Sequence, residues 1–155
     1  MRYLFSVSLS LAIMGISTAV NSAPGLQVDK PHARSENAIR AVLDAQREAW
    51  NRGDIEGYMD GYDRSPDTEF VSGDRINRGW QTVLERYKTT YDSREKMGRL
   101  TFSDLEITVL SKDSALVLGR WRLKRASDEP HGTFTLLFRK TKVGWKIVHD
   151  HTSSA

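Results

Sequence analysis

The sequence contains no cysteine among its 155 residues. This absence excludes disulfide bonds and a thiol nucleophile, so the folded chain must be stabilised by burial of a hydrophobic core. The sequence also lacks a glycine-rich phosphate-binding loop and a Gly-x-Ser-x-Gly motif. The nucleotide-binding and serine-hydrolase sites that these motifs mark are therefore not expected.

A concentrated charge of one sign is also missing. The 23 basic residues are offset by 20 acidic ones, giving a net charge of +3, and the basic residues are scattered. Their nearest approach to a cluster is Arg120, Arg122, Lys124 and Arg125, where alternation is typical of a solvated strand face. Because nucleic-acid binding needs a concentrated basic patch, the sequence predicts no nucleic-acid partner.

No apolar run reaches the roughly 20 residues that a membrane-spanning helix needs. The longest extends from Leu4 to Ile16, follows a basic start and precedes a run of small residues. This pattern is typical of a secretory signal peptide cleaved after Ala19 or Ser22, although an uncleaved anchor is an alternative. We expect a periplasmic or secreted protein with no membrane attachment after cleavage. Its segments would be a signal peptide at 1–22, a flexible mature N-terminus at 23–34 and a single domain at 35–153.

Apolar residues at helical spacing predict a first helix that begins at Ser35 and ends at Gly53. Gln46 is the one polar residue in the apolar stripe of this helix. A buried amide must be hydrogen-bonded. Gln46 therefore either lines a polar cavity or lies at the edge of the stripe and reaches water.

Two more helices and five strands are predicted from the remaining chain. They are a helix from Ile55 to about Tyr62 capped by Asp54, a strand at 69–72, a helix from Trp80 to about Tyr91, and strands at 100–109, 115–125, 133–140 and 145–152. Helices and strands are segregated, so the fold class is α+β, with three N-terminal helices packed in a strongly curved antiparallel sheet. A bulge near Ser103 and the glycine at 119 are the expected sources of curvature.

The last strand carries the ionisable groups of greatest interest. Alternation separates Trp145, Ile147, His149 and His151 from Val148, Asp150 and Thr152. Both sets contain apolar residues, so periodicity alone does not say which set faces the interior. The histidines at 131, 149 and 151 could together bind zinc. We favour core or interface histidines instead, and predict no metal site.

The order of elements resembles the nuclear transport factor 2-like superfamily, which includes ketosteroid isomerase and SnoaL-type polyketide cyclases. The matching stretches are 49–54, Arg78-Gly79 and 144–153, and the likeness spans about residues 35–153. More narrowly, the chain resembles a SnoaL-like family of the domain of unknown function 4440 type, which is also similar to the association domain of calcium/calmodulin-dependent kinase II. The resemblance implies a cone-shaped, cystatin-like α+β barrel with one pocket, usually in a homodimer.

The resemblance also implies which side chains face the pocket. It turns Val148, Asp150 and Thr152 inward. Asp150 would then have a raised pKa and could act as a general acid or base. Alternatively, Asp150 pairs with an arginine or with Gln46 and has a structural role. Tyr58 is either core or directs its hydroxyl into the pocket. The candidate ligand-binding residues are Gln46, Trp50, Tyr58, Phe70, Tyr87, Trp121, Leu136 and Asp150.

The chain departs from ketosteroid isomerase where that enzyme has its chemistry. The strand at 69–72 has no aspartate to match the isomerase's general base, and the first helix has no tyrosine. Because a fold does not establish a function, we expect an exported protein that binds a small, partly apolar molecule without a cofactor. The alternatives are an isomerase, cyclase or dehydratase acting on a carbonyl compound through Asp150, and a dimerisation or partner-binding module.

Overall fold

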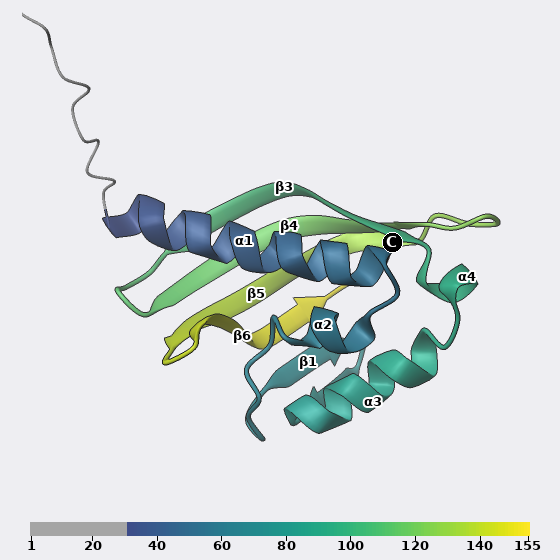
Figure 1. The fold of residues 1–155 in the computed structure, drawn as a ribbon, viewed down its shortest axis with the longest axis horizontal. Coiled ribbons are helices and arrows are strands. Elements are labelled where there is room, and N and C mark those ends of the chain that lie inside the picture. Colours follow the sequence, from purple (N-terminus) through teal and green to yellow (C-terminus); the bar gives the residue numbers. More distant parts are fainter. Residues whose placement is uncertain (1–30) are drawn as a thin grey trace, which may run out of the picture.

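A computed structural model describes residues 31–155, and the predicted signal peptide lies outside this range (Figure 1). The elements are α1 (Pro31–Asn51), α2 (Ile55–Met59), β1 (Glu69–Ser72), β2 (Arg75–Arg78), α3 (Trp80–Thr90), α4 (Arg94–Met97), β3 (Arg99–Val109), β4 (Ser114–Lys124), β5 (His131–Thr141) and β6 (Gly144–Thr152). The predicted α+β class is confirmed. No helix in this range is long and apolar enough to cross a membrane.

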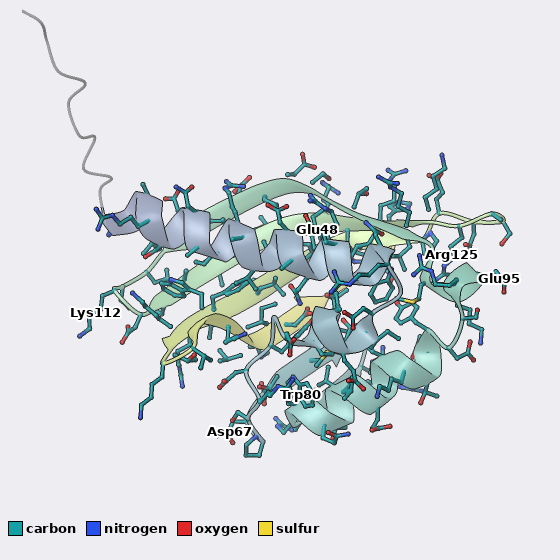
Figure 2. All side chains as sticks on the ribbon, viewed as in Figure 1. Glu48, Asp67, Trp80, Glu95, Lys112 and Arg125 are labelled. Carbon is teal, nitrogen blue, oxygen red and sulfur yellow. The ribbon has the colours of Figure 1, made fainter. Side chains whose placement is uncertain are left out.

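The six strands form one sheet in the order β2-β1-β6-β5-β4-β3. Neighbouring strands are antiparallel except β1 and β6, which are parallel. Helix α1 lies across the inner face of the long strands, and α2 and α3 lie beside β1 (Figure 1). Charged side chains such as Glu48, Glu95 and Lys112 extend outward from this arrangement (Figure 2). The helices and the sheet thus enclose the apolar side chains between them.

Two features predicted to curve the sheet are present. The pairing of β3 with β4 shifts register between Ser103 and Glu106, where Asp104 has a φ of 51°. A Cβ atom on Gly119 would lie 2.5 Å from the Phe134 ring and 2.8 Å from Leu105. Only glycine lets these side chains approach the β4 backbone so closely.

A second bulge, which the sequence did not reveal, interrupts β6. Phe138 pairs with Ile147 and Leu137 pairs with His149, so Val148 is an extra residue on β6. A bulge of this kind changes the alternation of side chains. Ile147 and Asp150 are consequently both buried, and Val148 does not border the cavity described below. The expectation that Val148 faces the pocket was therefore wrong.

Other corrections concern element boundaries. Within the described residues, helix α1 already includes Pro31, four residues before the predicted start at Ser35. Residues 31–34, predicted as flexible, are therefore helical. Helix α2 ends at Met59, earlier than predicted. Strand β2 and helix α4 replace expected loops; both are four residues long, too short to show periodicity.

Candidate functional site

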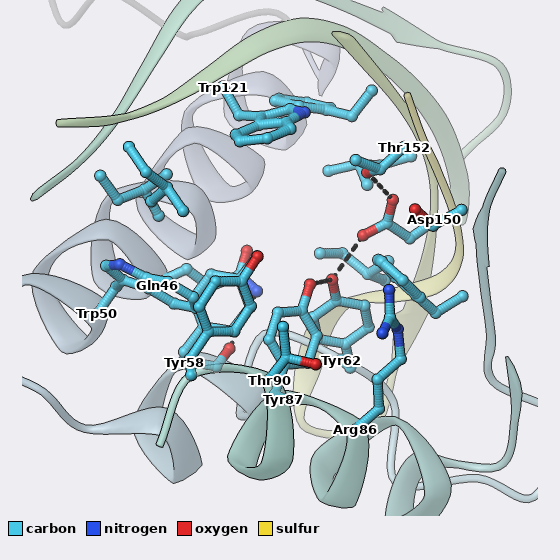
Figure 3. Close-up of a pocket in the computed structure, with 18 of the residues that line it drawn as sticks. Gln46, Trp50, Tyr58, Tyr62, Arg86, Tyr87, Thr90, Trp121, Asp150 and Thr152 are labelled. Carbon is cyan, nitrogen blue, oxygen red and sulfur yellow. Dashed lines mark hydrogen bonds between the residues drawn. The ribbon is translucent and has the colours of Figure 1, made fainter. Parts of the chain in front are cut away.

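One end of the barrel contains a cavity of about 160 Å³, bounded by α1, the α2 region, α3 and the inner face of the sheet (Figure 3). Every residue predicted to bind a ligand borders this cavity: Gln46, Trp50, Tyr58, Phe70, Tyr87, Trp121, Leu136 and Asp150. The structure therefore brings together side chains from seven separate elements or loops.

Asp150 is the buried carboxyl group of the cavity, and its side chain is held by two hydroxyl groups. Its Oδ2 accepts a hydrogen bond from the Tyr62 hydroxyl at 2.6 Å, and its Oδ1 accepts one from Thr152 Oγ1 at 2.7 Å (Figure 3). Burial raises the pKa of Asp150, while these two donors and the nearby His149 and His151 oppose the rise. Asp150 therefore holds a proton at higher pH than an ordinary aspartate does.

The structure answers two questions that the sequence left open. Asp150 pairs with hydroxyl groups, and not with an arginine or with Gln46. Gln46 is only 2% exposed and borders the cavity, so it does not lie at a solvated edge. Its Nε2 donates to the backbone oxygen of Tyr58 at 3.0 Å, which satisfies one side of the amide. Gly61 leaves room for this amide, because a Cβ there would lie 2.4 Å from Gln46 Cδ.

Three tyrosines give the cavity a wall with apolar faces and polar edges. The hydroxyls of Tyr62 and Tyr87 are 3.4 Å apart, and the ring of Tyr58 lies 5.2 Å from that of Tyr87 between centroids. Burial raises the pKa of all three hydroxyls, and the charge of Asp150 raises each of them further. The phenols are therefore neutral at physiological pH, and the single donor of Tyr62 is already used by Asp150.

The two tryptophans of the cavity contribute apolar surface only. Trp50 Nε1 donates to the backbone oxygen of Met97, and Trp121 Nε1 donates to that of Ser153, each at 3.0 Å. An indole has a single donor. Both donors are already used, so these rings can offer a bound molecule their faces and edges but no further hydrogen bond.

Sequence reasoning missed three polar side chains that border the cavity, those of Tyr62, Arg86 and Thr152. Tyr62 follows Tyr58 by four residues, a spacing that indicates a shared helix face and could have identified it. Thr152 was expected to face inward with Asp150, yet it was not chosen as a ligand-binding residue. Arg86 carried no signal, since a charged residue on a helix is usually solvated.

The histidines do not gather into a metal site. His149 Nδ1 lies 2.9 Å from Glu69 Oε2, and His131 Nδ1 lies 2.9 Å from the backbone oxygen of Glu129. His149 and then Arg78 lower the pKa of Glu69. Within residues 31–155, no three histidine or acidic side chains are grouped closely enough to hold a metal ion.

The SnoaL-like domain family model matches residues 39–155. A nuclear transport factor 2-like protein of unknown function from Shewanella oneidensis is 42% identical; the match covers 76% of this chain and 98% of that one, with a TM-score of 0.73. A ketosteroid isomerase-like protein from Erwinia carotovora atroseptica is 21% identical, with 76% of this chain and 94% of that one covered and a TM-score of 0.62. No curated protein matches the chain.

A proposed dehydratase of the nuclear transport factor 2-like family, from Streptomyces avermitilis, is also 21% identical; 79% of this chain and 97% of that one are covered, with a TM-score of 0.65. The two more distant structures show a likeness of fold alone. None of these matches confirms the narrower resemblance to the domain of unknown function 4440 type or to the kinase association domain. The family model matches residues 39–155, and the 42% identical structure covers 76% of this chain, so each match spans well over half of it. The chain belongs to the SnoaL-like domain family and has a nuclear transport factor 2-like fold.

Proposed function

We propose that this protein binds a small, partly apolar organic molecule in the cavity, with a polar group of the ligand beside Asp150. The observation that carries the proposal is a buried carboxyl group with two hydroxyl partners in a cavity lined largely by aromatic and aliphatic side chains. Ligand sites typically combine apolar walls with a few convergent polar groups, and a perturbed carboxyl pKa is frequent in them.

The volume of the cavity limits the size of the ligand. At about 160 Å³ it is close to the engineered cavity of about 150 Å³ that admits benzene. A single ring with a small polar substituent fits such a space. A fused-ring steroid would need the walls to move apart.

Calorimetric titration with single-ring probes, namely phenol, benzaldehyde, benzamide and benzoate, tests the proposal. Leu136 is 4% exposed and borders the cavity, so Leu136→Phe should fill space and weaken probe binding about tenfold or more. Leu116, 38% exposed on β4, provides the matched control, and Leu116→Phe should leave binding unchanged. Native mass spectrometry of the protein from its own host looks for a retained molecule. No probe binding together with no retained molecule would contradict the proposal.

A second candidate function is proton transfer on a carbonyl compound, as in an isomerase, cyclase or dehydratase. The position of Asp150 at the cavity favours it, because a buried carboxyl group of raised pKa can exchange a proton with a bound substrate. Asp150→Asn should then lower turnover about 100-fold or more while the dissociation constant changes little. Undiminished turnover in this variant would exclude Asp150 as the acid or base.

Export and homodimer formation are further parts of the proposal. The leader-like pattern of residues 1–22 supports export, and N-terminal sequencing of the exported protein tests it. Leu116 and Leu118, both exposed on the outer face of β4, support association of two copies or the binding of a partner. Light scattering of the mature chain should give the mass of a dimer; a monomer at every concentration would contradict this.

A further inference from the structure

Arg86 is a cation held at the cavity without an anionic partner among the described residues. Its side chain borders the cavity, and its guanidinium carbon lies 5.0 Å from the centre of the Phe70 ring. Lys88, two residues further along α3, pairs with Glu56 at 2.7 Å. By contrast, no carboxylate within residues 31–155 lies at ion-pair distance from Arg86.

The contact with Phe70 fixes the guanidinium while leaving its donors available. A guanidinium that stacks on a ring uses its face, and its N–H groups at the edge remain free to bind a carboxylate. Phe70 is the register partner of Asp150 across β1 and β6. Figure 3 accordingly shows Arg86 extending from α3 on the side of the cavity where Tyr62 and Asp150 meet.

We infer that the ligand of this cavity is a small ring-containing carboxylate, with its carboxylate group bound by Arg86 and its ring packed among the tyrosines. This inference rests on the proposed function and names the ligand class. Asp150 acts as the acceptor toward both Tyr62 and Thr152 and offers an anionic group no donor, so the anionic end of the ligand belongs at the free donors of Arg86. A cationic ligand would instead place like charges together at Arg86.

Benzoate and benzamide provide the test, because they share one ring and nearly the same shape but differ in charge. In calorimetric titrations at pH 7, the wild-type protein should bind benzoate about tenfold or more tightly than benzamide. Arg86→Met should weaken the binding of benzoate about tenfold or more and that of benzamide much less, so that the preference is lost. Arg86→Lys keeps the charge without the planar fork, and should retain part of the preference.

Arg64 offers a matched control outside the cavity. Its guanidinium lies 4.5 Å from the centre of the Trp80 ring and pairs with Asp60 at 2.8 Å, so Arg64→Met removes a similar stacked cation. This variant should bind both probes as the wild type does. Thermal unfolding of each variant verifies that it is folded before titration.

The possible failures are distinguishable. Equal binding of both probes by the wild-type protein would overturn the inference about Arg86 and leave the proposed pocket standing. A preference for benzoate that persists in Arg86→Met would also overturn it, since another cation would then be responsible. If the wild type binds neither probe, and native mass spectrometry detects no retained molecule, the proposed function itself fails.

Discussion

The two ends of the barrel are built from the same elements and differ in chemistry. At the end away from the cavity, here called the closed end, Leu43 of α1 and Phe138 of β5 are at most 1% exposed and belong to the hydrophobic core, while Ile147 of β6, also 1% exposed, reaches the border of the cavity. One turn or a few residues further along the same elements stand Gln46, Phe134 and Asp150. The closed end stabilises the fold by burying apolar surface. The open end, which contains the cavity, also buries polar groups, and their desolvation lowers stability. A single strand therefore contributes to the hydrophobic core at one end and lines the cavity at the other.

The largest expected difference between the ends comes from a matched pair of substitutions on β5. Phe138 is 0% exposed and does not border the cavity, so Phe138→Ala should lower the free energy of unfolding by about 3–5 kcal/mol. Phe134 is 4% exposed but already faces open space. Phe134→Ala should therefore destabilise the protein less and enlarge the cavity. Urea denaturation measures both, and an equal loss would show that the open end is packed as tightly as the closed end.

A smaller effect is expected when the open end loses one hydroxyl. Tyr62→Phe leaves Asp150 Oδ2 without its donor, which should lower the free energy of unfolding by about 1–3 kcal/mol. Because that bond opposes the rise in the pKa of Asp150, its removal should also raise this pKa further. Denaturation curves and NMR titration of the Asp150 carboxyl measure the two quantities.

Tyr91 is the control for this hydroxyl. It also borders the cavity, but its hydroxyl forms no hydrogen bond within residues 31–155. Tyr91→Phe should change stability by less than about 0.5 kcal/mol. Similar losses for both tyrosines would mean that the bond to Asp150 contributes nothing specific.

The difference between the two ends also explains what could be read from the sequence. Apolar periodicity predicted α1, α3 and the long strands, because burial on one face leaves a regular pattern. The bulge at Val148 was not predictable, since an inserted residue is visible only through its pairing with β5. Strand β2 is mostly exposed, and therefore left no apolar signal. A helix or strand could thus be predicted from the sequence where one of its faces is buried along its length.

The site was readable only in part, for a related reason. Aromatic residues such as Trp50 and Tyr87 stand out both as core and as pocket candidates. Arg86 looks like any solvated helix residue, because its role depends on the position of Phe70, 16 residues away in sequence and on another element. The pairing of Tyr62 with Asp150 joins residues 88 positions apart, and no local pattern encodes it. Polar contacts of this kind require the fold to be known.

The contribution of Asp150 to stability should depend on pH. The folded-state pKa of Asp150 lies above its ordinary value of 3.8, so between these two pKa values the folded protein holds more protons than the unfolded chain. The free energy of unfolding attributable to this group therefore falls as pH rises through that window. Asp150→Asn removes this titration. The free energy of unfolding of the wild type minus that of the variant, measured by urea denaturation, should therefore fall from pH 4 towards neutrality. A difference that stays constant or rises would contradict the raised pKa.

The smallest effect is expected for a substitution on the outer side of β6, the strand that carries Asp150. His149 adjoins Asp150 in sequence, but its side chain is 38% exposed and pairs with Glu69 across β1 and β6. Exposed ion pairs contribute little to stability because water screens them. His149→Ala should therefore leave the thermal midpoint and benzoate affinity unchanged within error, whereas Asp150→Asn changes the pH dependence. Added Zn²⁺ should not raise the midpoint of the wild type. A zinc-dependent rise that disappears in His149→Ala would instead indicate that the histidines bind metal. A candidate site would then lie on the surface of the barrel and not in its interior.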